Sequence, residues 1–296
     1  MTRSRSVPVV EIAVAAAAIV AIAVSAYLAG KQSESAAGGV DSRSTYDATG
    51  GGYRAWYEML QREGIRVERF EDRPAFLDRS VDVYVLSSNT PSGLLASEQR
   101  GEAPGVFSDG DWYALAKWVK GGGRLVWVSD GVDSPDYLNA PEFTASGPAA
   151  DNAVTVAPAA IARGVASVSG TSRLRVPLWA ERAPPVIADD TGSVVASYPL
   201  GTGEVTIVSD QTLFENERFG RADNATLAYD LATDGLTPHG AVAFDEWSHG
   251  HQAGDSWWAI LPPPFQVAFV LAAAALVVLG VGTALRFGPV VRIDEP

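Results

Sequence analysis

Two long apolar runs, one near each end, constrain this chain more than any other feature. Val7 to Gly30 holds 24 residues and Phe265 to Leu285 holds 21, with Glu11 as the one charged side chain in both runs together. A helix rises 1.5 Å per residue and a bilayer core is roughly 30 Å thick, so each run is long enough to cross a membrane once. Residues 7–30 and 264–285 are therefore predicted to be transmembrane helices.

The first run has a second interpretation as a cleaved signal peptide. Arg3 and Arg5 would form its basic start, and Val24-Ser25-Ala26 a cleavage site of small residues. The apolar part of a signal peptide usually holds about 7–15 residues, and the longer run here favours an uncleaved anchor. The chain has no cysteine. That excludes a lipoprotein anchor, disulfides, thiolate metal ligands and a cysteine nucleophile.

Basic residues flanking the two runs predict the orientation of the chain. Arg3 and Arg5 precede the first run, and Arg286 and Arg292 follow the second. Cytoplasmic flanks are enriched in Arg and Lys, so both termini are predicted to be cytoplasmic, in a multi-pass protein of the cell membrane. The predicted order is a cytoplasmic start (1–6), the first span (7–30), a Ser- and Gly-rich linker (31–52), an extracytoplasmic domain (53–262), the second span (264–285) and a cytoplasmic tail (286–296).

The predicted extracytoplasmic region is acidic. Between Lys31 and Pro264 lie 18 basic and 32 acidic side chains, a net charge of −14. Nucleic acids and anionic lipid surfaces are both bound through Lys and Arg. The charge balance therefore predicts no nucleic-acid partner and no peripheral binding to anionic lipid.

Apolar spacing within the domain predicts alternating helices and strands. The stripe of one helix is formed by Tyr53, Trp56, Tyr57 and Leu60, and that of a second, capped by Asp109, by Trp112, Leu115, Ala116 and Val119. Apolar strands are predicted over 65–70, 81–87, 124–129 and 241–244, and a hairpin over 193–198 and 204–209. This alternation is typical of a parallel sheet with crossover helices. A segment at about 131–185, rich in Ala, Ser, Val and Pro, is predicted to be an insertion.

Several segments resemble the DUF4350 family of bacterial membrane proteins, a domain of unknown function. They are STYDATGGGYRAWYEMLQREGIRVERF, LAKWVKGGGRLVWVSDG, LGTGEVTIVSDQTLFENERFGRADNA and VAFDEWSHG, in this order. The resemblance implies an α/β fold, a flavodoxin-like or class I glutamine amidotransferase-like three-layer sandwich, with two transmembrane helices. Members are often encoded beside a MoxR-type AAA+ ATPase and other membrane proteins, which implies these as partners. No activity is established for the family.

The motifs of the main catalytic classes are missing from the sequence. Amidotransferases of this fold use a cysteine on a tight turn after a strand, where this chain has Ser129-Asp130-Gly131. No G-x-S-x-G elbow surrounds Ser129, and the glycine runs at 50–52 and 121–123 do not follow the strand-to-helix order of a phosphate loop. The sequence therefore predicts no catalytic residue and no cofactor, and favours a protein that is not an enzyme.

Acidic residues follow the apolar strands and form the candidate site. Asp130, Asp210 and Asp245 each come directly after a strand, and Glu246 and His249 lie beside the last of them. Because the carboxyl ends of parallel strands share one edge, these side chains are predicted to converge. Carboxylates with one imidazole suit a divalent cation. The competing interpretation, favoured by the absence of a tight ligand spacing, is that they cap turns.

Two functions follow as hypotheses. The first is a membrane-anchored, non-catalytic, amidotransferase-like module that binds a partner or ligand at its strand ends, within an ATPase-associated assembly. The second is a metal-dependent hydrolase that uses Asp210, Asp245, Glu246 and His249. Under either hypothesis Phe244 is predicted to lie in a sheet. Asp245, Glu246 and His249 are then predicted to face each other or the Ser209-Asp210 turn, since buried polar groups without partners inside the domain are costly.

Overall fold

The computed structural model describes residues 43–87, 107–129, 136–145 and 151–251, and three single residues beyond them, Phe265, Phe269 and Ala272. The chain divides into one compact unit over 34–253 and a second unit formed by 1–33 and 254–296. The first of these units contains the sheet, the helices and the candidate site.

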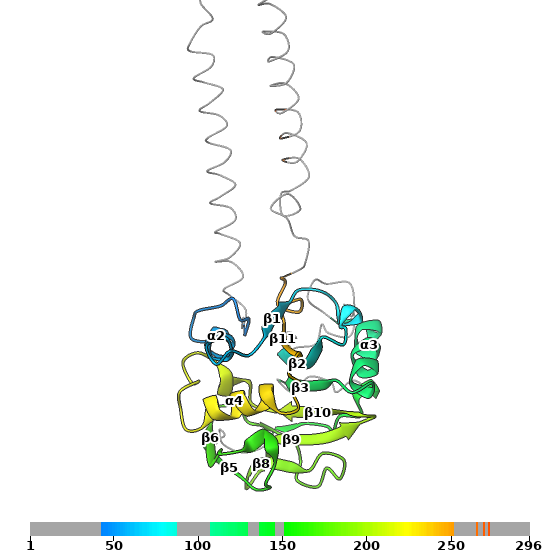
Figure 1. The fold of residues 1–296 in the computed structure, drawn as a ribbon. Coiled ribbons are helices and arrows are strands. Elements are labelled where there is room, and N and C mark those ends of the chain that lie inside the picture. Colours follow the sequence, from blue (N-terminus) through cyan, green and yellow to red (C-terminus); the bar gives the residue numbers. More distant parts are fainter. Residues whose placement is uncertain are drawn as a thin grey trace, which may run out of the picture. The chain divides into compact units, whose positions relative to one another are not determined.

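A mixed sheet of nine strands forms the middle of this unit (Figure 1). The strands, in their order across the sheet, are β1 (Val67–Phe70), β11 (Ala241–Asp245), β2 (Val81–Ser87), β3 (Arg124–Val128), β10 (Gly203–Val208), β9 (Gly192–Leu200), β8 (Pro185–Asp189), β5 (Asp151–Thr155) and β6 (Ser167–Ser169). Neighbours from β1 to β10 are parallel, and every later pair is antiparallel. Two short strands, β4 (Thr144–Ala145) and β7 (Leu174–Arg175), pair separately.

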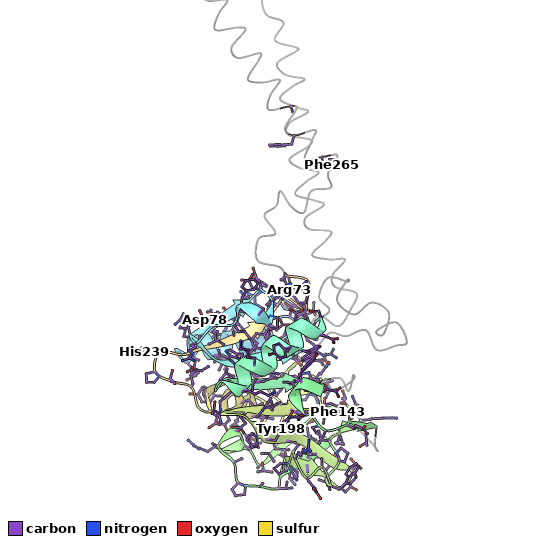
Figure 2. The ribbon with its side chains drawn as sticks, turned by 90° about the vertical axis from the view of Figure 1, so that its right-hand side faces the viewer. Arg73, Asp78, Phe143, Tyr198, His239 and Phe265 are labelled. Carbon is purple, nitrogen blue, oxygen red and sulfur yellow. The ribbon has the colours of Figure 1, made fainter. Side chains whose placement is uncertain are left out.

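Helices cover both faces of the sheet. They are α2 (Arg54–Arg62), α3 (Asp109–Lys120) and α4 (Asn224–Thr233), with short 3-10 helices η2 (Pro74–Phe76), η3 (Asp136–Leu138), η4 (Ala160–Ala162) and η5 (Gln211–Phe214). Strand side chains alternate between faces. Val83 and Val85 therefore pack with α2 and α4, whereas Tyr84 and Leu86 pack with α3. Figure 2 shows α3 in front of the sheet, with Phe143 and Tyr198 on the same face.

Local periodicity predicted several of these elements correctly. Trp56, Tyr57 and Leu60 are the buried face of α2, and β2 has the predicted bounds. The hairpin of β9 and β10 is also confirmed. The N-cap of α3 is Ser108 rather than Asp109, because Ser108 and Asp111 exchange side-chain and backbone hydrogen bonds in a capping box.

The LGTG turn between β9 and β10 closes against the end of α3. The backbone N–H and the hydroxyl of Thr202 both donate to the Lys120 carbonyl oxygen, at 3.2 and 3.0 Å. Gly201 has a φ of +67°, and a Cβ on Gly203 would lie 2.1 Å from the Val119 carbonyl oxygen. Only glycine fits these two positions, because the turn approaches the helix backbone so closely.

The predicted flavodoxin-like three-layer sandwich is wrong. A flavodoxin-like sheet is parallel with the strand order 2-1-3-4-5, whereas this sheet is mixed and has nine strands in a different order. The segment at about 131–185 explains much of the difference, because it supplies β5 and β6 and the start of β8, which extend the sheet in antiparallel pairs. Strands of three to five residues show too little apolar alternation for the sequence to indicate how they pair.

The transmembrane part of the predicted fold also has no support in this structure. Among the residues that the structure describes, no helix is both long enough and apolar enough to cross a membrane. Apart from Phe265, Phe269 and Ala272, the predicted spans 7–30 and 264–285 lie outside the described residues.

Candidate functional site

The carboxyl ends of four parallel strands form the edge where the candidate site was predicted. β11, β2, β3 and β10 are neighbours in this order and run parallel, as predicted. Asp245 ends β11, Ser87 ends β2, Ser129 follows β3, and Ser209 with Asp210 follows β10. We call these residues the strand-end row.

The row does not gather the predicted acidic residues into one cluster. Asp245 and Asp210 end strands that lie three positions apart, which is roughly 14 Å at about 4.8 Å per strand. Asp130 lies outside the described residues. Within the described part of the chain, no three His, Asp or Glu side chains are grouped so that they could hold a metal ion. The structure therefore brings Asp245, Glu246 and His249 into one turn and leaves Asp210 apart.

Glu246 is fully buried, and both of its carboxylate oxygens accept hydrogen bonds. Oε2 accepts from the Ser44 hydroxyl at 2.6 Å, and Oε1 accepts from the Thr45 backbone N–H at 2.8 Å and the Thr45 hydroxyl at 2.5 Å. Arg69 donates to the Thr45 hydroxyl and carbonyl oxygens at 2.8 and 3.1 Å. We call these four residues the Glu246 cluster. Burial raises the pKa of Glu246 against the opposing effect of the Ser44 and Thr45 hydrogen bonds.

Aromatic rings enclose the arginine of this cluster. The Arg69 guanidinium lies 4.1 Å from the ring centroid of Tyr46 and 4.2 Å from that of Tyr57. Tyr46 also lies against His251, with ring centroids 4.5 Å apart, and its hydroxyl donates to Glu71. Burial, followed by the Glu71 hydrogen bond, raises the pKa of Tyr46 to about 12. Tyr46 keeps 41% of its surface exposed, so an aromatic ring with a cation beneath it faces solvent.

Asp245 is buried beside the cluster and has its own partners. The Tyr84 hydroxyl donates to Oδ1 at 2.7 Å, and Oδ2 accepts from the Ser248 hydroxyl and from its backbone N–H at 3.3 Å. Burial raises the pKa of Asp245 to about 7, in spite of the hydrogen bonds from Ser248 and Tyr84 that favour the ionised form. These contacts fix the turn that follows β11.

His249 completes the turn through a contact with β2. Its Nε2 lies 2.9 Å from the Ser87 hydroxyl, and its buried Nδ1 has no partner among the described residues. Burial, then the charges of His251 and Arg43, lower the pKa of His249 to about 3, so the imidazole is neutral at physiological pH. A serine beside an imidazole is also the geometry of a nucleophile and its base. A base with so low a pKa is poorly matched to that role, and the contact fits a brace between β2 and the turn.

The prediction that Asp245, Glu246 and His249 have partners inside the domain is confirmed, but the predicted partners are wrong. The side chains bind Ser44, Thr45, Tyr84, Ser87 and Ser248 rather than each other or the Ser209-Asp210 turn. Phe244 lies in β11, and Asp245, Glu246 and His249 each contact a side chain of another segment. None of them points into solvent without a partner.

The buried titratable groups predict two opposite pH dependences. Asp245 has a pKa of about 7 in the folded chain against an ordinary 3.8. Between these values the folded chain binds a proton that the unfolded chain has lost, so stability falls as pH rises from about 4 to about 7. His249 has a pKa of about 3 against 6.5. Between those values only the unfolded chain binds the proton, so stability falls as pH drops from about 6.5 to about 3.

Asp245→Asn is expected to remove the first dependence. Its free energy of unfolding relative to wild type should rise between pH 4 and pH 7, by an amount on the order of 2–4 kcal/mol. For His249→Gln, the free energy of unfolding relative to wild type should instead rise as the pH is lowered over the same range. Glu246 is present in both variants, so its own titration cancels except for its electrostatic interaction with Asp245. Urea unfolding curves at half-unit pH intervals measure this, and profiles that run parallel to wild type would disprove the assignment.

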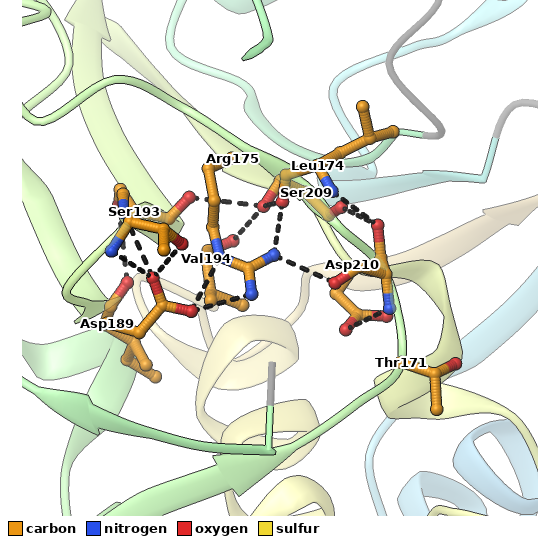
Figure 3. A network of polar contacts seen from close by, with 12 residues as sticks. Thr171, Leu174, Arg175, Asp189, Ser193, Val194, Ser209 and Asp210 are labelled. Carbon is orange, nitrogen blue, oxygen red and sulfur yellow. Dashed lines mark hydrogen bonds and ion pairs between the residues drawn. The ribbon is translucent and has the colours of Figure 1, made fainter. Parts of the chain in front are cut away.

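Asp210 belongs to a second polar network, centred on the buried Arg175 (Figure 3). The Asp210 carboxylate accepts from the backbone N–H and hydroxyl of Thr212, at 3.0 and 2.7 Å, and from the Ser172 backbone N–H at 3.0 Å. Asp210 therefore caps the N-terminus of η5, as the capping interpretation of the sequence predicted. Its bond to Ser172 also holds the segment that leads into β7. The Ser209 hydroxyl lies within hydrogen-bond distance of the backbone carbonyl oxygens of Leu174, Ser193 and Val194, at 3.0, 3.2 and 3.3 Å.

Arg175 has no exposed surface and uses its whole guanidinium. Nε and Nη2 donate to Asp189 Oδ2 at 2.8 and 2.7 Å, and Nη1 donates to the carbonyl oxygens of Ser172 and Leu174 at 3.0 and 2.5 Å. Burial raises the pKa of the Asp189 carboxyl, but the hydrogen bonds from Arg175 and Thr191 outweigh it and the pKa is lowered. The network holds β7 and the segment before it against the strands of the main sheet.

Sequence reasoning missed several of these residues. Ser44 and Thr45 fall in the segment predicted as a linker, yet they are almost fully buried. Arg69, Tyr84 and Arg175 carry no motif. Apolar periodicity could not have identified Ser44 and Thr45, because they lie in a short polar turn. Their place at the start of a segment that resembles a known family was the one signal that they belong to the domain.

Comparison with known proteins gives one family and several distant structures. Residues 45–232, which are 188 of 296, match a family described as a domain of unknown function (DUF4350). No curated protein matches the chain.

Three of the similar solved structures illustrate how distant these likenesses are. The exo-β-1,4-mannosidase Op5Man5 from Opitutaceae bacterium strain TAV5 is 22% identical with a TM-score of 0.31, over 48% of this chain and 26% of that one. The β-galactosidase from Rahnella sp. R3 is 17% identical with a TM-score of 0.40, over 60% and 26%. The N-terminal domain of mmIFT52 is 13% identical with a TM-score of 0.41, over 59% and 86%. The chain spans about a quarter of the two glycosidases, and all three TM-scores are too low to establish a shared fold.

Proposed function

The chain belongs to the DUF4350 family, and we propose that it is a non-catalytic interaction domain that binds a protein partner at the strand ends. The observation that carries this proposal is the bonding of Glu246, whose two buried carboxylate oxygens accept three hydrogen bonds from Ser44 and Thr45. A buried carboxylate with every oxygen engaged holds the segment entering the domain to the segment leaving it. Such a group stabilises the fold and is not free to act on a substrate.

The surface above the Glu246 cluster supplies the side chains for binding. Tyr46 is exposed over Arg69 and lies against His251. Tyrosine and arginine are enriched where proteins bind each other, because they bury a large area with few freely rotating bonds. We propose Tyr46, Arg69 and His251 as the contact surface.

The partner class follows from the family resemblance. We propose that the domain works within an assembly that contains a MoxR-type AAA+ ATPase and the membrane proteins encoded beside it. Its location outside the cytoplasmic membrane, with both termini inside, is a proposal from the arginines that flank the apolar runs of the sequence. Reporter fusions at Gly39 and at Pro296 should report opposite sides of the membrane, and matching signals would reject this topology.

Tyr46→Ser tests the contact surface. The tagged full-length chain, isolated from native membranes, is expected to bring down the ATPase or its neighbouring membrane proteins. Tyr46→Ser should lower their recovery several-fold without lowering the melting temperature by more than a few degrees. Tyr113→Ser is the matched control, because Tyr113 is a 60% exposed tyrosine on α3. Equal recovery with wild type and Tyr46→Ser would reject the surface, and no recovery with wild type would reject the assembly.

A metal-dependent hydrolase at Asp245, Glu246 and His249 with Asp210 is the second candidate. One observation favours it, namely that His249 Nδ1 is buried and has no partner among the described residues. Metal binding would require the carboxylates to exchange their present partners for the ion. Stoichiometric divalent metal in the purified full-length chain, lost in Asp245→Ala, would support this candidate. A wild-type chain that stays metal-free after incubation with zinc and manganese would end it.

A further inference from the structure

The nine-stranded sheet has two edges, β1 and β6, at its opposite ends (Figure 1). The outer side of β6 is closed by two side chains. Asp223 accepts from the backbone N–H groups of Ala166 and Ser167, at 2.9 and 3.1 Å. Asn224 exchanges two hydrogen bonds with the Ser169 backbone, at 3.0 and 2.9 Å. No strand can pair with β6 without displacing them.

Among the described residues, β1 has a paired strand on one side only, that of β11. The carbonyl oxygens of Arg66 and Phe70 face β11, where they accept from Val242 and Glu246 at 2.9 Å each. Backbone groups alternate in direction along a strand, so the N–H and C=O groups of Val67 and Arg69 face away from β11. Within the described residues these four groups have no hydrogen-bond partner. A row of unpaired backbone groups is a template for another strand.

The side chains of β1 carry a charge pattern along this edge. Arg66 and Glu68 share a face of the strand with Phe70, whose ring contacts Tyr84 on the α3 side of the sheet. Arg66 is exposed and Glu68 half-buried. A positive and a negative side chain therefore lie two residues apart on one face of an unpaired edge.

We propose that β1 pairs with β1 of a second copy of this chain, antiparallel about a two-fold axis at Val67. This register places each Arg66 directly opposite Glu68 of the second copy, in two symmetric ion pairs. The neighbouring registers are worse, because an axis at Glu68 opposes two carboxylates and an axis at Arg69 opposes two guanidinium groups. Pairing in the Val67 register joins the two copies of Val67 by two backbone hydrogen bonds, because the N–H and C=O of Val67 both face outward. The Arg69 N–H then faces the Ile65 carbonyl oxygen of the second copy, whereas the Ile65 N–H already donates to the Leu60 carbonyl oxygen of its own chain. A two-fold axis makes the same edge serve both partners.

This inference rests on the proposed function only in treating the chain as an interaction domain. A monomeric chain that still recovers the ATPase would reject self-pairing and leave the proposed function standing. A dimeric chain that recovers no partner would do the reverse.

Charge reversal tests the register. The mass of the full-length chain in density-matched detergent is expected to be that of a dimer. Arg66→Glu and Glu68→Arg should each weaken association at least tenfold, and the double variant should restore it to within about threefold of wild type. Arg79→Glu is the matched control, since Arg79 is an exposed arginine outside β1 and its replacement makes the same charge change. A monomeric wild type, or a double variant as weak as the singles, would overturn the proposal.

Cysteine pairing gives a second test that does not depend on charge. The chain contains no cysteine, so Arg66→Cys and Glu68→Cys each introduce a single thiol. In the proposed register residues 66 and 68 of the two copies oppose each other with Cα atoms about 4.5 Å apart, within reach of a disulfide. Two residues 68 would lie about 8 Å apart, which is too far. A mixture of the two variants should form disulfide-linked dimers several-fold faster than either alone, and equal rates in all three samples would overturn the register.

Discussion

Glu246→Ala is expected to destabilise the domain by about 4 kcal/mol, one of the two largest effects of a single substitution that we predict. The carboxylate is fully buried and receives three hydrogen bonds from Ser44 and Thr45. Removing it leaves buried donors without an acceptor, at a cost of about 1–3 kcal/mol each. The two hydroxyl groups can rotate toward another acceptor, but the Thr45 backbone N–H cannot. Urea unfolding of the full-length chain, followed by tryptophan fluorescence, measures the loss.

Glu246→Gln is the matched control for this prediction. The amide keeps one oxygen for the two Thr45 donors and loses the other, so we expect a cost of about 1–2 kcal/mol. Hydrogen exchange supplies a local readout, because the Thr45 amide should exchange much faster in Glu246→Ala than in wild type. A variant within 1 kcal/mol of wild type, with Thr45 still protected, would show that the cluster does not hold the two segments together.

Arg175→Ala is expected to have a comparable effect, about 3–5 kcal/mol of lost stability. Arg175 has no exposed surface, and its guanidinium bridges Asp189 and two carbonyl oxygens (Figure 3). Breaking a buried pair by removing one partner is costly, because the other group is left in a poorly solvated site. The truncated side chain also leaves a cavity beside β7.

Arg173→Ala is the matched control for Arg175. Arg173 is exposed and lies two residues away, so its loss should change stability by no more than about 0.5 kcal/mol. A double-mutant cycle with Asp189→Asn should give a coupling energy of about 1–3 kcal/mol between Arg175 and Asp189. Additive single effects would mean that the contact is formed but contributes nothing measurable.

The local elements could be predicted from the sequence because their causes are local. The stripe of Trp56, Tyr57 and Leu60 repeats at helical spacing, and Val81 to Ser87 is apolar enough to be buried on both faces. The cap of α3 differed by one residue, since Ser108 and Asp109 are both good caps and only the reciprocal contact with Asp111 decides between them.

The strand order could not be predicted, because it depends on pairing between distant segments. β11, the last strand of the domain, lies between β1 and β2, and three strands from the segment at about 131–185 or its end extend the sheet. The sequence of a short strand does not indicate which other strand it will pair with. The flavodoxin-like prediction came from the family resemblance and the parallel rhythm of the first half, and it did not include the antiparallel strands that extend the sheet beyond β9.

The sequence by itself determined which polar residues would follow the strands, and that Asp245, Glu246 and His249 would need partners. Only the tertiary structure decided what those partners are. Ser44 lies 202 positions before Glu246 and Tyr84 lies 161 before Asp245. No spacing rule connects such residues, because the folded backbone brings them together. Burial raises the pKa of the Asp245 and Glu246 carboxyl groups, because a charged group is poorly solvated inside a protein. The hydrogen bonds to these carboxyl groups offset the cost of burying them.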